Sequence, residues 1–124
     1  AGRTEDDYRL VNVLAGTMAD VYENVFVINI PTAINSIVVG TNRPSTLAQF
    51  RANLDTIQNP TLRRVANVAR TSACEYAAPG SPRAGSSDAC DFATQLGRMV
   101  FTDDLAPVEQ VIDQIILGYI SASR

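Results

Sequence analysis

The sequence contains no lysine and no histidine, and all ten of its cationic residues are arginine. A Schiff-base lysine, a phosphate-binding lysine and a histidine general base are therefore excluded within this chain. Its serines likewise lack the histidine partner that a hydrolase triad needs. With two cysteines and no histidine, the chain cannot supply the usual four protein ligands of a zinc site. We expect no catalytic residue and no metal site in it.

A basic surface and a long apolar run are missing as well. The formal net charge is −3, whereas a nucleic-acid-binding domain normally presents a basic face. No apolar run approaches the roughly 20 residues that span a bilayer. We therefore expect neither nucleic-acid binding nor membrane insertion. The 124 residues can bury one core, and the first three, Ala-Gly-Arg, indicate a processed or excised piece, so we expect a single domain or a fragment of one.

What is present begins with two short apolar runs within residues 24–42, NVFVINIPTAINSIVVGTN. β-branched residues dominate both runs, and Asn and Pro punctuate them, which is typical of a strand pair. Pro31 should end the first strand, and the link over residues 32–34 is too short for a parallel crossover. We therefore predict an antiparallel hairpin. Because neither run alternates cleanly between apolar and polar residues, we expect both of its faces to be covered.

The apolar spacing elsewhere predicts helices over residues 4–22, 46–57, 60–70, 91–99 and 105–121. Thr4 with Asp7, and Thr46 with Gln49, form patterns typical of a capping box. The Asn59-Pro60 pair is typical of an N-cap followed by the first helical position. The predicted fold class is α+β, with an antiparallel β-hairpin packed against four to five helices.

The first and third predicted helices are amphipathic. In the first, a buried stripe is expected from Val11, Leu14, Ala15, Met18 and Tyr22. Arg9, Asn12 and Asp20 fall on its other faces. In the third, Arg63, Arg64 and Arg70 lie opposite an apolar face that contains Leu62, Val65, Ala66 and Ala69. These arginines form either an anion-binding patch or an ordinary solvated helix face.

Residues 71–90, TSACEYAAPGSPRAGSSDAC, are predicted to form a loop because Pro, Gly and Ser recur throughout. Cys74 and Cys90 flank this loop. Either they form a disulfide that closes the loop at its base, or both remain free thiols in a reducing compartment. The stretch GSPRAGSS is not a phosphate-binding loop, since no predicted strand precedes it and no helix with a lysine follows.

Three carboxylates, Asp103, Asp104 and Glu109, form the one constellation that suggests ligand chemistry. Neighbouring carboxylates bind a cationic amine or a hard metal ion, so these residues are our candidates for substrate binding. In the alternative interpretation, Asp104 is the N-cap of the last helix and the other charges interact with its dipole.

The stretch FTDDLAPVEQVID, residues 101–113, is similar to the closing motif of spermidine synthase-like proteins, the polyamine aminopropyltransferase family. The resemblance is closest to the bacterial branch that is often fused to membrane segments. The order of the preceding stretches agrees, with a long helix, then YENVFVINI, a short link and NSIVVGTN. The loop at 71–90 with its two cysteines departs from the family's pattern and leaves the compartment open.

The resemblance implies the C-terminal part of a Rossmann-like, methyltransferase-type fold. In that family the glycine-rich nucleotide turn and the catalytic acidic residues lie earlier in the chain. The whole parent protein is then expected to transfer an aminopropyl group from decarboxylated S-adenosylmethionine to an amine. The present segment would be a structural part without activity of its own and without a cofactor.

The alternative is a stand-alone interaction or dimerisation module. The expected partners are the remainder of the parent chain or a second copy, bound through the hairpin, because a two-stranded sheet alone is marginal. The expected location of the segment is either the cytoplasmic or the extracytoplasmic face of a bacterial membrane protein.

Overall fold

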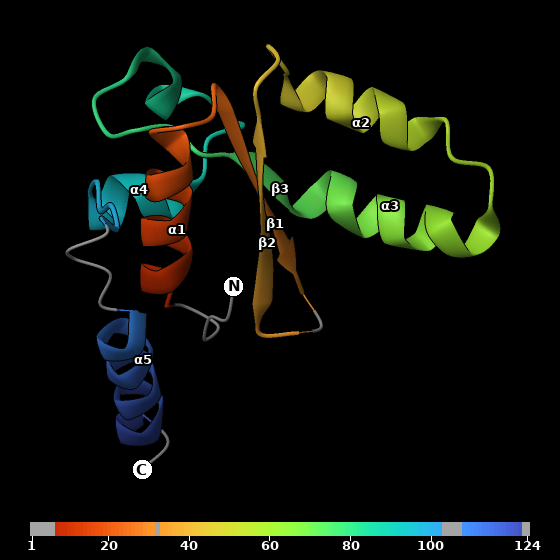
Figure 1. The fold of residues 1–124 in the computed structure, drawn as a ribbon. Helices are drawn as coiled ribbons and strands as arrows, with labels where there is room; N and C mark the ends of the chain where they lie inside the picture. Colours follow the sequence, from red (N-terminus) through yellow and green to blue (C-terminus); the bar gives the residue numbers. More distant parts are fainter. Residues whose placement is uncertain (1–6, 32, 103–107, 123–124) are drawn as a thin grey trace.

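The computed structural model of the chain describes residues 7–31, 33–102 and 108–122 (Figure 1). The fold is α+β, as predicted, with a three-stranded antiparallel sheet in the order β2-β1-β3 and helices on both faces. In chain order the elements are α1 (Arg9–Ala19), β1 (Asn24–Ile30), β2 (Asn35–Thr41), α2 (Leu47–Asp55), α3 (Pro60–Ser72), β3 (Ala73–Glu75), the 3-10 turn η1 (Pro82–Gly85), α4 (Asp91–Leu96) and α5 (Val108–Ala122).

The predicted antiparallel hairpin is confirmed, with β1 and β2 paired from Asn24 opposite Thr41 to Ile30 opposite Asn35. The register places Val25 and Val27 of β1 on one face of the sheet and Phe26 and Ile28 on the other. The first four residues of β1 are buried, whereas exposed and buried positions mix along β2. The central strand is therefore covered on both faces, and the outer strand only in part.

One face of the sheet packs against α1 and α4, which lie side by side in Figure 1. The core there comprises Val11, Ala15, Val25, Val27, Tyr76, Cys90, Phe92 and Ala93. The rings of Tyr8 and Phe92 stack with centroids 5.1 Å apart and extend this core beyond the start of α1. A small second cluster of Leu10, Val13 and Ile115 attaches α5 to α1.

The opposite face packs against α2 and α3, which together project from the sheet as an arm (Figure 1). Both helices begin as predicted. Thr46 and Gln49 form a reciprocal capping box on α2, and the Asn59 side chain accepts hydrogen bonds from the first turn of α3. The core between the arm and the sheet is small, with Phe26, Leu47 and Ala73 buried.

Two predictions about α1 are wrong. The helix begins at Arg9, so Asp7 precedes it instead of occupying its third position, and Thr4 lies outside the described residues. Asp7 instead pairs with Arg9, whose hydrogen bonds lower the pKa of that carboxyl. Asn12, which is predicted to lie outside the buried stripe, is fully buried, and its Nδ2 donates to the Gly97 carbonyl at 2.9 Å.

The predicted loop at 71–90 is also corrected. Helix α3 continues to Ser72, and Ala73–Glu75 form β3 along the free side of β1. Three residues without a β-branched side chain carry no strand signal of their own. This strand exists because of its pairing with Phe26, Val27 and Ile28, a contact far away in the sequence.

The remaining predicted helices differ in length only. Helix α2 ends at Asp55, α4 ends at Leu96, and α5 is described from Val108 because residues 103–107 lie outside the described part. The proposed cap at Asp104 falls in that gap. None of the described helices has the length and hydropathy that a bilayer span requires.

Cys74 and Cys90 form a disulfide, which is the first of the two alternatives left open by the sequence. It joins β3 to the residue just before α4 across 16 positions of sequence. Two backbone hydrogen bonds close the same loop, from Glu75 N to the Asp88 carbonyl at 2.8 Å and from Cys90 N to the Glu75 carbonyl at 2.9 Å. The loop base is therefore held by three links.

Removing the bridge with Cys74→Ala and Cys90→Ala should lower the free energy of unfolding by about 3 kcal/mol, the chain-entropy value for a loop of this length. Far-UV circular dichroism of the folded variant should stay unchanged, because the backbone links remain. Chemical denaturation measures the difference, and reduced wild-type protein is the control that should match the double variant. Two free thiols in the unreduced, unfolded protein would contradict the bridge.

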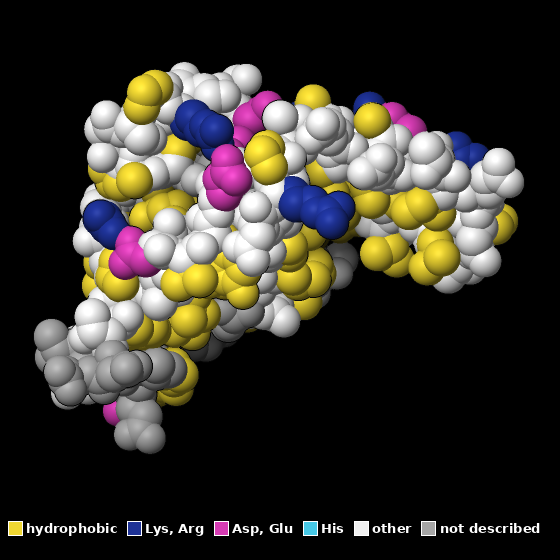
Figure 2. Space-filling view, turned by 45° about the horizontal axis from the view of Figure 1, so that its top comes forward, with side chains coloured by type: hydrophobic (Ala, Val, Ile, Leu, Met, Phe, Trp, Pro, Cys, Tyr) yellow, Lys and Arg dark blue, Asp and Glu magenta, His cyan; other side chains and the backbone are white. Residues whose placement is uncertain are grey.

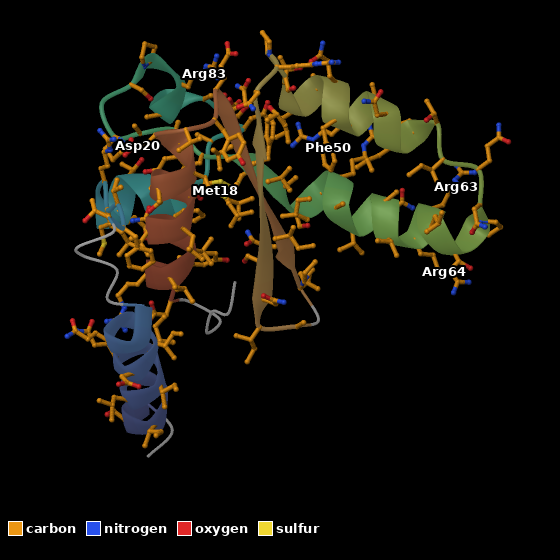
Figure 3. The ribbon with its side chains drawn as sticks, in the orientation of Figure 1. Met18, Asp20, Phe50, Arg63, Arg64 and Arg83 are labelled. Carbon is orange, nitrogen blue, oxygen red and sulfur yellow. A yellow bond between two sulfur atoms is a disulfide. The ribbon has the colours of Figure 1, made fainter. Side chains whose placement is uncertain are left out.

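Gly40 on β2 is a close-approach position. A Cβ built there would lie 2.4 Å from Tyr22 Cδ2 and 2.9 Å from Met18 Cε. The ring of Tyr22, which follows α1 in the chain, therefore packs directly on Gly40. Figure 3 shows Met18 on α1 on the side that faces the hairpin.

We expect Gly40→Ala to lower the free energy of unfolding by about 1–3 kcal/mol, as overpacking in a core does. Gly85→Ala is the matched control, since a Cβ at Gly85 meets nothing within 4 Å. Urea denaturation of both variants tests the difference. Equal stabilities would show that Tyr22 does not pack on this face.

Candidate functional site

The predicted carboxylate site falls outside the part of the chain that the structure describes in full. Asp103 and Asp104 lie outside the described residues, and Glu109 lies in α5 with its side chain outside them. Substrate binding by these three residues stays a prediction. In the part of the chain that the structure does describe, no three Cys, Asp or Glu side chains are grouped so as to hold a metal ion.

The three arginines of α3 lie in different environments. Arg70 forms an ion pair with Asp55 of α2, which links the two helices of the arm. Arg63 and Arg64 lie at the far end of the arm, exposed to solvent (Figure 3), and neither makes an ion pair with a described residue. A patch of three free guanidinium groups is therefore not formed, and the two that remain free belong to one turn of helix.

A polar cluster that the sequence did not indicate centres on Glu75. Its Oε1 accepts hydrogen bonds from Arg83 at 2.7 Å and from Asn24 Nδ2 at 3.2 Å. The buried Asn24 also accepts from the backbone N–H of Ser45 through its Oδ1 at 3.1 Å, and thus joins β1 to the start of α2. These residues are far apart in the sequence and share no local spacing, so no motif could reveal them. The cluster connects the loop after β3 to the N-terminal end of β1.

The disulfide lies beside a cleft of about 520 Å³ between β3 and α4. Its wall combines uncharged polar side chains with apolar ones and the disulfide, and the full set is Tyr8, Asn29, Thr71, Ser72, Ala73, Cys74, Ala89, Cys90, Asp91, Phe92 and Gln95. Among the described lining residues Asp91 carries the only charge. A thiolate released there would meet a carboxylate and no cation, which is the opposite of the setting that activates cysteines. The geometry favours a structural bridge over a redox-active one.

A second cavity, of about 350 Å³, lies where the sheet meets the start of α2. Its lining combines apolar and uncharged polar side chains, which are Phe26, Ile28, Val39, Thr41, Ser45, Thr46, Gln49, Phe50 and Asn53. Such a cavity offers van der Waals contact and hydrogen bonds but no charge. It suits an apolar side chain better than a charged substrate.

Three buried side-chain polar atoms have no hydrogen-bond partner among the described residues: the Oγ of Ser81, the Oδ1 of Asn12 and the hydroxyl of Tyr76. A Cβ built on Gly16 would lie 3.2 Å from the Tyr76 hydroxyl, so the atoms of Asn12 and Tyr76 belong to the contact between α1 and the segment after α4. Burial raises the pKa of Tyr76, while the Arg98–Asp20 ion pair nearby acts on it in opposing directions.

With the fold and these sites established, we compared the chain with known proteins. Neither the models of protein families, nor curated proteins, nor solved structures gave a match.

The raised pKa of Tyr76 gives a pH prediction. Because the folded state holds the phenol neutral, the stability that this provides is fully present below about pH 10 and is lost as pH rises through the raised pKa. Tyr76→Phe should remove this loss, and at neutral pH it should change stability by less than about 1 kcal/mol because no hydrogen bond is broken. Denaturation of both proteins at neutral and alkaline pH tests this. Stabilities that fall in parallel would show that Tyr76 ionises normally.

Proposed function

We propose that this chain is a non-catalytic C-terminal structural segment of a spermidine synthase-like transferase, in which it completes the sheet of the larger protein. The observation that carries the proposal is the outer strand β2. It lies at the end of the sheet, with no strand among the described residues paired to its outer side. The resemblance of residues 101–113 to the family's closing motif supplies the family.

Strand β2 lacks the features by which proteins protect an edge. Its seven residues, NSIVVGT, include no charge and no proline, and it pairs with β1 over its whole length without a bulge. On the face toward the arm, Ile37 is 48% exposed and Val39 is 38% exposed. A long, uncharged, half-exposed edge in a natural protein is normally covered by another strand or helix.

The apolar cavity beside Val39 supports the same conclusion. It lies between α2 and the face of the sheet toward the arm, where Val39 stays partly exposed, so an apolar side chain from a neighbouring element could fill it. In the proposed parent, the earlier strands and helices would cover this edge and this face together. Aminopropyl transfer from decarboxylated S-adenosylmethionine would then depend on residues in that earlier part of the chain.

A second candidate, a stand-alone dimerisation module, is favoured by the sequence of β2 itself. Seven uncharged residues centred on Val38 can pair antiparallel with the same strand of a second copy. In that register Ile37 of each copy would lie opposite Val39 of the other, which joins the exposed apolar side chains of both. This is the hairpin-mediated self-association that the sequence suggested.

Calorimetric titration with spermidine, putrescine and an S-adenosyl ligand should show no binding to this chain. Hydrogen exchange then separates the two candidates. The outward amides of β2 should exchange rapidly in the isolated chain and become protected when the preceding part of the parent is present. Binding of any of the three ligands would contradict the non-catalytic role. Protection of β2 that rises with the concentration of the isolated chain would support the dimerisation module instead.

A further inference from the structure

Beyond the sheet edge, two helices leave an apolar ridge in solvent. The α3 ridge consists of Leu62, Val65 and Val68, and Val65 is 62% exposed. The α5 ridge consists of Ile112, Ile116 and Ile120 with Leu117 beside it, and Leu117 is 63% exposed. Figure 2 shows hydrophobic side chains gathered along the arm that α2 and α3 form. Unlike scattered surface residues, each set is contiguous along one helix face.

The two ridges carry opposite charge. Helix α3 contains Arg63, Arg64 and Arg70 and no acidic residue. Helix α5 contains Glu109 and Asp113 and no basic residue. Arg64 is four positions before Val68, and Asp113 is three before Ile116, so a charge borders the ridge in each case. Because Arg64 makes no ion pair with a described residue, its guanidinium is available to a carboxylate on another surface.

The spacing of the two ridges is complementary as well. Residues of the α3 ridge recur every third position, and those of the α5 ridge recur every fourth. A ridge of the first kind packs into a groove of the second kind when two helices cross at about 20°. The helices have 13 and 15 residues, so both are about 20 Å long and can contact each other along their whole length.

Within one molecule these ridges do not meet. Helix α3 projects on one side of the hairpin, whereas α5 lies beyond the N-terminal end of α1 on the other side (Figure 1). Pairing of α3 with α3, or of α5 with α5, would bring like charges together and is disfavoured. We propose that the α3 ridge of one copy of this chain binds the α5 ridge of a second copy. This contact is separate from the β2 edge, and two-fold symmetry would form it twice.

The test combines two variants that each remove one ridge. The α3 variant carries Leu62→Gln and Val65→Gln, and the α5 variant carries Ile116→Gln and Leu117→Gln. Glutamine is a good helix former, and all four side chains are exposed, so both variants should fold like the wild type by circular dichroism. The matched control is Val21→Gln with Ile34→Gln, two exposed aliphatic residues on neither helix.

Sedimentation velocity should show self-association of the wild type and of the control at chain concentrations up to about 100 µM. Each ridge variant alone should associate at least about tenfold more weakly, because every contact then lacks one ridge. A 1:1 mixture of the two variants should partly regain association, since one intact α3 ridge meets one intact α5 ridge. Raising the salt concentration should weaken the wild-type complex.

A wild type that stays monomeric at that concentration would overturn the proposal. So would an α5 variant that associates like the wild type, because the contact would then lie on α3 alone or on the hairpin. A mixture no stronger than the separate variants would overturn the pairing of α3 with α5. None of these outcomes depends on the parent protein, so the proposed structural role and this interface can fail independently.

Discussion

The structure depends on the burial of β1 between two helical layers. Val25 and Val27 pack on α1 and α4, while Phe26 packs on the arm, so three consecutive residues of one strand belong to two cores. Both edges of β1 are paired as well, to β2 and to β3. The strands β2 and β3 and the helices α1 and α3 all contact this strand. Elements that lie farther from β1, such as the end of the arm and most of α5, keep apolar side chains in solvent.

Polar and covalent links also connect the elements around β1 to one another. The disulfide and the backbone bonds of Glu75 hold β3 and α4 together at one edge of the sheet. Asn24 connects the same glutamate to the start of α2, so the loop, the sheet and the arm share one buried amide. A buried polar group contributes little net energy when satisfied but is costly when its partner is lost. These links therefore specify the arrangement more than they add to the core.

The sequence predicted those parts whose signals are local. The hairpin, the capping box at Thr46 and the N-cap at Asn59 depend on residues within a few positions of one another, and the structure contains all three. Strand β3 and the burial of Asn12 were missed because their causes are long-range. The first exists through pairing with β1, and the second through a hydrogen bond to Gly97. The Glu75 cluster likewise joins residues that no spacing relates, and the predicted carboxylates fall outside the described residues or have their side chains outside them.

The uncovered surfaces differ in kind, and the difference indicates what each one binds. The edge of β2 exposes backbone hydrogen-bonding groups and uncharged side chains, so only another strand can satisfy it fully. The α3 and α5 ridges lie on helices and present side chains alone, with arginines in the sequence of one helix and acidic residues in that of the other. A strand partner is selected by backbone geometry, whereas a helix partner is selected by ridge spacing and charge. The two proposed contacts, a strand beside β2 and a second copy on the ridges, use different surfaces and are compatible with each other.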